Sequence, residues 1–255
     1  MSELYTISNN ERNFLLPLFK ENRYDTVIMK SILAGYQGTA VTDSKINPTV
    51  SRLDSGAYTI FGGNPKSIAA IDLIRKAPIH VVTPEHSEWE NLLQNEFEGK
   101  ITYQPFYKFL PHSLNKDYLS KLAGNIDNSY KILRINRELA RQLSKDIDND
   151  YFFEHFTSID DFLTRGIGFC VIHNNKIVSA VTSMAAAEQV INIEIETHFD
   201  YRNKNLGTVV CASLLLYCQE NHIEAQWLAA NDISCKLAEK LGYVKSVGYK
   251  TFLIS

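Results

Sequence analysis

Tyr201-Arg202-Asn203-Lys204-Asn205-Leu206-Gly207-Thr208 is the stretch of sequence that decides the fold. It follows a β-prone run at 190–197, Val-Ile-Asn-Ile-Glu-Ile-Glu-Thr, and it opens an apolar run at 209–218 that predicts a helix. The N–H groups of such a loop point into one concavity, and the positive end of the helix dipole lies behind them. The stretch therefore predicts a site for a phosphate or pyrophosphate, to which Arg202 and Lys204 add two positive charges.

A second pattern lies downstream, where a β-prone run at 224–230 precedes a helix-like segment and a final β-prone run to the C-terminus. Asn231 or Asp232 can cap the start of this helix, because both side chains accept hydrogen bonds from backbone N–H groups. Gly242 suits its C-terminal end, where the chain needs a positive φ. With the upstream elements added, the expected order is strand, helix, two hairpin strands, strand, anion loop, helix, strand, helix and strand.

The loop Arg202-x-x-Asn205-x-Gly207 resembles the R/Q-x-x-G-x-G/A loop with which GNAT N-acetyltransferases wrap the pyrophosphate of acetyl-CoA. Asn205 replaces the first glycine, and asparagine is among the few other residues that tolerate a positive φ. The downstream loop at 231–234 and Leu-Gly-Tyr at 241–243 resemble the matching family elements, in the same order along the chain. The last 90 or so residues further resemble the GNAT branch that includes the zwittermicin A resistance protein.

The resemblance implies a set of residues for binding acetyl-CoA. The pyrophosphate would lie on the loop, whose residues are Arg202, Asn203, Lys204, Asn205, Leu206, Gly207 and Thr208. Ile195 and Thr197 would run beside the pantetheine, with a backbone N–H near this point polarising the thioester carbonyl. Asn231 and Ser234, after the next strand, would contact the coenzyme from the other side.

Glu194 and Glu196 are the candidate general bases, because carboxylates on a half-buried strand can have raised pKa values. They alternate with isoleucines, so that the two-residue period places both on one face unless a bulge intervenes. The alternatives are that both are solvated surface glutamates, or that His198 is the base.

The proton donor to the departing thiolate is less defined. Many family members carry a tyrosine five residues before the final aromatic residue of the Leu-Gly-Phe/Tyr motif, and here that position is Ala238. Ser234, Tyr243 or water is left for the role, or the thiolate leaves unassisted. Ser234 could equally only begin the helix. Cys235 has no His or Asp partner nearby in sequence, which argues against an acyl-enzyme.

With 255 residues the chain is long enough for two domains, and we expect one at 1–128 and one at 129–255. In the first, helices at about 10–21 and 25–34, strands at 38–42 and 57–61 joined by a polar segment, a helix at 66–76 and a strand at 79–82 repeat the order of a GNAT module. Gly62-Gly63-Asn64-Pro65 has glycines, but the proline removes an N–H donor. The first domain is thus expected to be a degenerate GNAT-like module.

Residues 101–110 form an aromatic, strand-prone stretch interrupted by Pro105, and 115–128 is a polar segment that we expect to contain the domain boundary. In the second domain, a first strand at 130–135 and a helix near 138–143 precede a hairpin at 168–183 with Asn174-Asn175 in its turn. The acidic segment at 151–166 is expected near the acceptor side of the site.

Composition limits the remaining classes. The net charge of −3 predicts no general attraction of nucleic acid, and no apolar run approaches the roughly 18 residues of a membrane span. The N-terminus lacks the features of a signal peptide, so a cytoplasmic location is expected. The four cysteines lie in apolar contexts without ligand spacing, which favours buried thiols over a metal site. The sequence does not decide between a monomer and a homodimer.

The sequence therefore predicts an α/β (α+β) protein with a GNAT-like mixed sheet and flanking helices. Its expected function is acetyl-CoA-dependent transfer of acetyl directly to the primary amine of a small molecule, such as an amino-sugar or peptide-like antibiotic. The alternatives are a weakly active or inactive acyl-CoA-binding regulatory protein, suggested by Asn205 and Ala238, and a protein N-acetyltransferase. No metal is expected.

Overall fold

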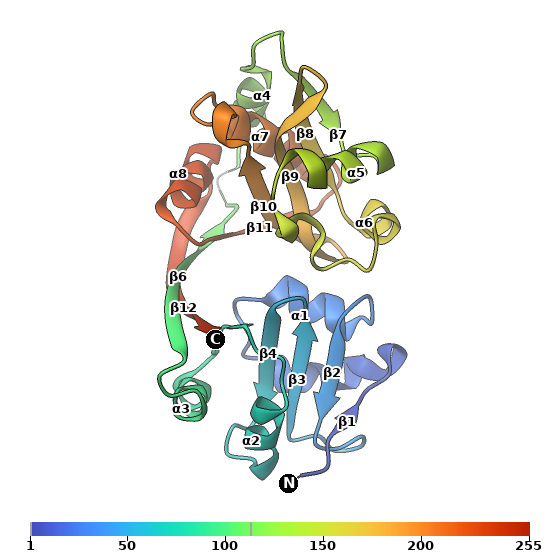
Figure 1. Ribbon diagram of the computed structural model, residues 1–255, viewed down its shortest axis with the longest axis vertical. Helices are drawn as coiled ribbons and strands as arrows, with labels where there is room; N and C mark the ends of the chain where they lie inside the picture. The colour runs from blue at the N-terminus through green and yellow to red at the C-terminus, as the bar shows by residue number, and fades with distance from the viewer. Residues whose placement is uncertain (1, 113) are drawn as a thin grey trace. The chain divides into compact units, whose positions relative to one another are not determined.

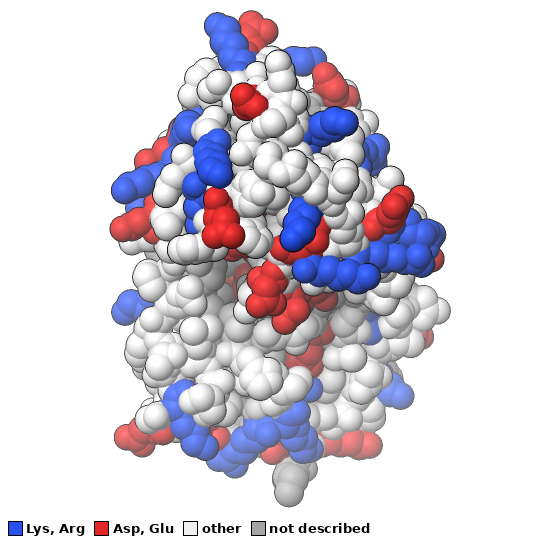
Figure 2. All heavy atoms as spheres, turned by 45° about the horizontal axis from the view of Figure 1, so that its top comes forward, with Lys and Arg blue, Asp and Glu red and all other residues white. Residues whose placement is uncertain are grey.

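The computed structural model describes residues 2–112 and 114–255, which form two compact units drawn in Figure 1. The N-terminal unit comprises Met1–Phe106 with Gly248–Ser255, and the C-terminal unit comprises Tyr107–Val247. The boundary expected at residue 128 thus lies inside the C-terminal unit. Within the described ranges, no helix is long and apolar enough to cross a membrane. On the face shown in Figure 2, basic and acidic side chains are interspersed, in keeping with the small net charge.

The N-terminal unit is a mixed sheet with helices, in the order β1-β2-β3-β4-β5-β12. All neighbours are antiparallel except β4 and β5, which are parallel. The strands are β1 (Tyr5–Thr6), β2 (Thr39–Thr42), β3 (Val50–Ser55), β4 (Tyr58–Gly63), β5 (Val81–Val82) and the end of β12 (Val244–Ile254), whose residues 248–254 belong to this unit. The helices are the 3₁₀ helix η1 (Asn9–Phe19), α1 (Thr26–Leu33), α2 (Ile68–Arg75) and α3 (Ser87–Glu96).

The C-terminal unit has the sheet order β6-β11-β10-β9-β8-β7, again with a single parallel pair, β10 and β11. Its strands are the end of β6 (Ile101–Leu110), whose residues 107–110 belong to this unit, and β7 (Lys131–Arg134), β8 (Gly168–His173), β9 (Lys176–Ala187), β10 (Val190–Thr197) and β11 (Glu224–Ala229). Its helices are α4 (Lys116–Gly124), α5 (Arg137–Asp146), η2 (Asp150–Phe153), α6 (Ile159–Arg165), η3 (Phe199–Tyr201), α7 (Leu206–Glu220) and α8 (Asp232–Leu241). The predicted fold class is confirmed.

The two units repeat one topology, with one exchange. In chain order, four antiparallel strands are followed by a helix, a strand parallel to the fourth, a helix and a last strand. The last strand of each repeat completes the other sheet: β12 pairs with β5, and β6 pairs with β11. The C-terminal residues 248–255 are therefore part of the N-terminal unit.

One strand of the N-terminal unit was predicted wrongly. The polar segment expected to join residues 42 and 57 contains β3, in which every residue is buried. Its polar side chains are paired inside the unit: Arg52 Nε lies 2.8 Å from Asp54 Oδ2, and Arg52 Nη1 donates to Leu73 O at 2.7 Å. Composition suggested a loop because these polar groups are satisfied internally rather than by water.

Two further local predictions had different outcomes. The polar segment expected at 115–128 contains α4, which Asn115 caps by accepting a hydrogen bond from Tyr118 N, and α4 packs against α7. The polar segment is therefore largely helical and packs within the C-terminal unit. The hairpin of β8 and β9 is confirmed, because Asn174 and Asn175 have φ of 50° and 62°, as a two-residue turn of this kind requires.

Helix α7 is the centre of the C-terminal unit. It contacts β8, β9, β10 and β11, and most of its side chains are buried. Cys211 and Cys218 lie on it as buried free thiols, and burial raises the pKa of Cys218 to about 12. This packing fixes the N-terminus of α7 at the end of β10, where the anion loop lies.

Candidate active site

The parallel strands β10 and β11 part after three residue pairs. Val190, Ile191 and Asn192 pair with Glu224, Ala225 and Gln226, respectively. Beyond this point β11 pairs on its other side with β6 through Trp227–Ala229, and β10 has no partner on the side of β11 within the described ranges. The carboxyl ends of two parting parallel strands are a common place for a ligand, because unpaired backbone groups and helix N-termini meet there.

The loop between β10 and α7 has the conformation expected of an anion site. Asn203 and Asn205 have positive φ of 63° and 64°, so left-handed backbone conformations alternate with that of Lys204, whose φ is not positive. For the N–H groups of residues 203–208, all of which the structure describes, it shows no hydrogen-bond acceptor. Six donors next to a helix N-terminus are a favourable environment for a pyrophosphate.

Asn205 tolerates the conformation that the replaced glycine would otherwise supply. Its side chain does not cap α7, and its Oδ1 instead accepts a hydrogen bond of 2.6 Å from Lys240 Nζ. The asparagine is therefore held aside by α8, and the N–H groups at the start of α7 stay uncapped.

Gly207 lies in the first turn of α7 and faces the end of β10. A Cβ at this position would lie 3.5 Å from Thr197 Oγ1, 3.9 Å from Leu237 and 4.0 Å from Ile195, which are ordinary contacts. The fold itself therefore has room for a side chain at residue 207. Its absence keeps the surface of the loop open beside Ile195 and Thr197, the residues expected to adjoin the coenzyme.

The two cations of the loop are partly engaged. Arg202 Nη2 donates to Glu196 Oε1 at 3.0 Å, and Arg202 Nε donates to Thr197 O at 3.2 Å. Lys204 Nζ lies 4.7 Å from the centre of the Tyr201 ring. Both charges remain at the loop, but Arg202 also ties the loop to the end of β10.

Glu194 and Glu196 lie on the same face of β10, away from α7. The irregularity in the β9–β10 pairing falls between Asn192 and Ile193, where Met184 of β9 is skipped, and thus precedes both carboxylates. The expected alternation is therefore kept across Glu194 and Glu196.

The two carboxylates differ in environment. Burial raises the pKa of Glu194 to about 7, with the nearby charges of Glu196 and Glu154 adding to the shift, while a hydrogen bond from Asn149 opposes it. Glu196 is instead bonded to Arg202 and to the N–H of Thr197. A carboxylate with a pKa near neutrality can both take and release a proton at physiological pH.

Two polar residues near Glu194, Asn149 and Asn192, were not predicted as site residues from the sequence. Asn149 Nδ2 donates to Glu194 Oε1 at 2.9 Å, and nothing in its polar surroundings distinguishes it in sequence. Asn192 precedes Glu194 on the same face, is only 3% exposed, and neither of its side-chain polar atoms has a hydrogen-bond partner. The sequence feature that could have identified Asn192 is the presence of an amide side chain inside the apolar run Val190–Ile193.

The histidines have other environments. His198 Nδ1 accepts a hydrogen bond of 3.3 Å from Asp200 N and begins η3, so it belongs to the loop rather than to the face of Glu194. His155 is fully buried, and burial lowers its pKa to about 4, which keeps the imidazole neutral at physiological pH.

Ser234 lies at the start of α8. Asn231 Oδ1 accepts a hydrogen bond of 2.9 Å from Ser234 N and caps the helix, and Ser234 Oγ accepts another of 3.0 Å from Trp227 Nε1. The hydroxyl proton of Ser234 is thereby left for donation to a ligand. Tyr243 is buried and donates its hydroxyl proton to Ala225 O at 2.8 Å, which makes it a core residue.

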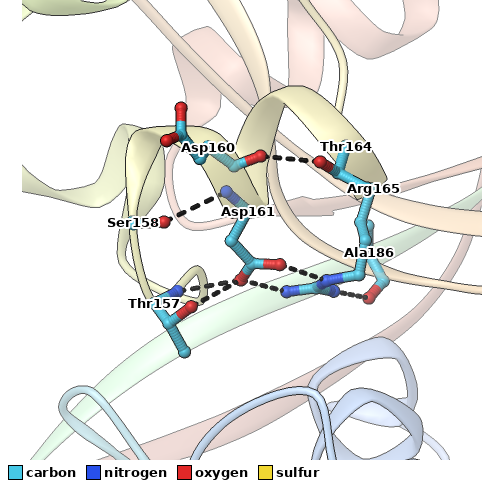
Figure 3. A network of polar contacts seen from close by, with 7 residues as sticks. All are labelled: Thr157, Ser158, Asp160, Asp161, Thr164, Arg165 and Ala186. Atoms are coloured by element: carbon cyan, nitrogen blue, oxygen red, sulfur yellow. Dashed lines mark hydrogen bonds and ion pairs between the residues drawn. The ribbon is translucent and has the colours of Figure 1, made fainter.

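The segment at 151–166 is fixed by a polar network shown in Figure 3. Arg165 forms two hydrogen bonds of 2.6 Å with Asp161, and its Nη1 donates to Ala186 O at 3.1 Å. The hydrogen bond from Arg165 is the main cause that lowers the pKa of Asp161. Thr157 donates to the same carboxylate through its N–H and hydroxyl. This network holds α6 against the end of β9.

Known proteins show the same architecture. The chain matches the family model described as GNAT acetyltransferase over residues 16–252. It is 22% identical to the uncharacterized N-acetyltransferase YdfB of Bacillus subtilis, over 99% of both chains.

Among solved structures, a GCN5-related N-acetyltransferase-like protein from Streptococcus suis superposes with a TM-score of 0.84 at 23% identity, over 96% of this chain and 99% of that one. A tandem GNAT protein from the clavulanic acid biosynthesis pathway superposes with a TM-score of 0.61 at 13% identity, over 98% of each chain. The likeness in fold agrees with the family match, which spans most of the sequence. The chain belongs to the GNAT acetyltransferase family and is an acyltransferase, with acetyl-CoA as the cosubstrate that this family uses.

Proposed function

We propose that this protein transfers acetyl from acetyl-CoA directly to the primary amine of a small molecule, with the coenzyme bound in the C-terminal unit. The row of unused N–H groups at residues 203–208, after a strand that carries a half-buried carboxylate, is the observation that supports this most. It combines a pyrophosphate site with a proton acceptor, Glu194, that lies three residues before the end of the preceding strand.

The loop would hold the pyrophosphate through these N–H groups and through the side chain of Lys204. All residues from Arg202 to Thr208 would thus form the pyrophosphate site. The pantetheine would lie along the unpaired edge of β10 beside Ile195 and Thr197, with Asn231 and Ser234 opposite. A backbone N–H of this edge would stabilise the oxyanion that develops on the thioester carbonyl.

Glu194 would be the general base. It takes a proton from the acceptor ammonium, directly or through water, and the neutral nitrogen attacks the thioester carbon. The C–N bond forms, and the tetrahedral intermediate collapses with cleavage of the C–S bond. The thiolate takes a proton from the Ser234 hydroxyl or from water, and the second proton that the nitrogen loses on becoming an amide returns through water to that oxygen. Glu196 is the less suitable base, because its carboxylate already bonds Arg202.

The acceptor is proposed from a sequence likeness and from one buried side chain. The likeness of residues 194–202 and 227–243 to the branch that includes the zwittermicin A resistance protein favours an amine-bearing antibiotic or a related small molecule. Asn192 would contact such an acceptor, because its buried amide has one donor and one acceptor group unsatisfied on the face of Glu194. We place the enzyme in the cytoplasm, where acetyl-CoA is available.

The N-terminal unit is proposed to have no coenzyme site, as a module that kept the fold and lost the loop. The Asn64 N–H donates to Thr49 O at 2.9 Å, and the Lys66 N–H donates to Asn64 Oδ1 at 3.0 Å. The intervening Pro65 has no N–H. The donors that a phosphate would need are thus used within the loop itself.

Transfer of ¹⁴C-acetyl from acetyl-CoA to a panel of amines tests the proposal. We expect label in aminoglycoside-like or peptide-like small amines and its loss in Glu194→Gln. Label that appears only in added proteins would favour a protein acetyltransferase. Coenzyme binding without transfer to any amine would favour the inactive regulatory alternative.

A further inference from the structure

The N-terminal unit contains a cavity of about 730 Å³. Three segments line it: residues 17–22 at the end of η1, residues 61–65 at the end of β4, and residues 85–89 at the start of α3, together with Thr49. Its volume is in the range of small-molecule binding sites. All of its lining belongs to one unit, so the cavity is a feature of that unit alone.

The cavity occupies the same topological position as the candidate active site of the C-terminal unit. β4 and β5 are parallel and pair only through Tyr58 and Thr59 with Val81 and Val82. The lining segments 61–65 and 85–89 lie at and beyond the carboxyl ends of these two strands. Parting parallel strands with a helix N-terminus beside them form a ligand position in both repeats.

The charge of the lining differs from that of a phosphate site. Glu21, Glu85 and Glu88 supply three carboxylates, whereas Lys20 supplies the only ammonium among the lining residues, all of which are described. The loop at 62–66 uses its N–H groups internally, whereas α3 begins among the lining residues without a side-chain cap, and Glu88 is already paired with Lys66. The balance of charge in the lining, three carboxylates against one ammonium, is what favours a cation.

The lining also contains hydrogen-bonding groups that the protein leaves unused. Glu85 Oε2 accepts a hydrogen bond of 2.8 Å from Arg23 N, but Glu85 Oε1 is shielded from solvent and has no partner. Both polar side-chain atoms of Asn22 are shielded and without a partner as well. Such groups cost free energy when they are left unpaired, and a ligand that donates hydrogen bonds would remove that cost.

The environment of Glu85 agrees with a missing positive charge. Burial raises its pKa to about 7 and the charge of Asp25 adds to the shift, while the backbone N–H groups of Arg23 and Tyr24 and the charge of Arg23 oppose it. A bound ammonium would favour the ionised carboxylate and form a charge-assisted hydrogen bond with it.

We propose that this cavity binds a small molecule that carries a primary ammonium group, with Glu85 as its counter-ion and Asn22 as a second hydrogen-bond acceptor. The site is separate from the acetyl-transfer site and does not depend on transferase activity. Amine binding to the N-terminal unit would allow this module to sense or retain the class of compound that the family acetylates.

Isothermal titration of the full chain with ethylamine, putrescine and glucosamine tests the site. 1,4-Butanediol and succinate serve as uncharged and anionic controls for putrescine. Because an amine can also enter the C-terminal unit as an acceptor, each titration is repeated in Glu194→Gln. We expect saturable binding of at least one amine, neither control bound, and the binding retained in Glu194→Gln.

Glu85→Gln should weaken this binding about tenfold or more, since it removes a charge-assisted hydrogen bond. Glu88→Gln, whose side chain is 49% exposed and bonded to Lys66, should weaken it less and serves if Glu85→Gln fails to fold. Glu98→Gln, an exposed position outside the lining, should bind as the native chain does. Native affinity in both Glu85→Gln and Glu88→Gln, or no binding of any of the three amines, would overturn the proposal. Loss of acetyl transfer alone would not affect it.

Discussion

Asn149 Nδ2 donates a 2.9 Å hydrogen bond to Glu194 Oε1 and so joins the segment before η2 to the middle of β10. The bond orients the carboxylate and occupies one of its oxygens, while Oε2 has no protein partner in the described ranges. Glu194 is therefore both positioned and able to accept a proton, although its surroundings disfavour the ionised form.

Glu194→Gln should lower kcat/KM about 10²-fold and leave the affinity for acetyl-CoA nearly unchanged, because it removes the proton acceptor and no coenzyme contact. In the native enzyme kcat/KM should rise with pH through about 7, as the carboxyl group with this pKa loses its proton. In the variant this rise should vanish, and activity should recover partly at high pH, where the amine is already neutral.

Glu196→Gln is the matched control for this prediction, because it lies on the same face two residues away. It should retain more activity than Glu194→Gln, although it loses the bond to Arg202. Equal activity of both variants and the native enzyme at pH 7 would show that neither carboxylate is the base, and His198 or water would take the role.

Gly207→Val should weaken acetyl-CoA binding at least about tenfold, because the side chain fills the surface that the pyrophosphate approaches. The protein should fold, since a Cβ at residue 207 meets nothing closer than 3.5 Å. Gly124→Val, where a Cβ meets nothing within 4 Å, is the control and should bind normally. Native affinity of folded Gly207→Val in a fluorescence or calorimetric titration would remove the loop from the coenzyme site.

Ser234→Ala should lower turnover about tenfold or more if the hydroxyl protonates the thiolate, whereas Ser234→Thr should keep most of it. The alanine variant also deprives Trp227 Nε1 of its acceptor, which should cost about 1 kcal/mol of unfolding free energy. Steady-state kinetics beside urea unfolding separate the two effects. Native turnover in Ser234→Ala would assign the proton to water.

Asp25→Asn should change how stability depends on pH. Burial raises the pKa of Asp25 to about 6, above its ordinary value of 3.8, so the folded state binds the proton more tightly than the unfolded state. The native protein should lose about 3 kcal/mol of unfolding free energy from this group as pH rises from about 4 through 6. The variant should lack that loss. Parallel slopes of native and variant in urea unfolding at several pH values would refute this.

The fold was largely predictable where local pattern and tertiary structure agree. The loop at 201–208 and Asn231 at the start of α8 carry signals that depend only on nearby residues, such as positive φ, capping and alternation. β3 was missed because its polar side chains pair with each other and with the Leu73 carbonyl, a contact about twenty residues away. Sequence cannot show where a polar group finds its partner.

The same limit applies to the site. Glu194 and Glu196 were equivalent in sequence, and only their partners Asn149 and Arg202 separate them. The exchange of β6 and β12 could not be predicted either. Both strands follow a helix in the expected order, and nothing in the sequence of either strand indicates which strand it pairs with.

The central claim is that the chain binds one acetyl-CoA, on the loop at 203–208. Calorimetric titration of the full chain with acetyl-CoA tests it most directly, with Gly207→Val titrated in parallel. We expect one site per chain, strongly weakened in the variant. Two sites per chain would contradict the loss of the loop in the N-terminal unit, and no binding at all would contradict the proposed coenzyme site itself.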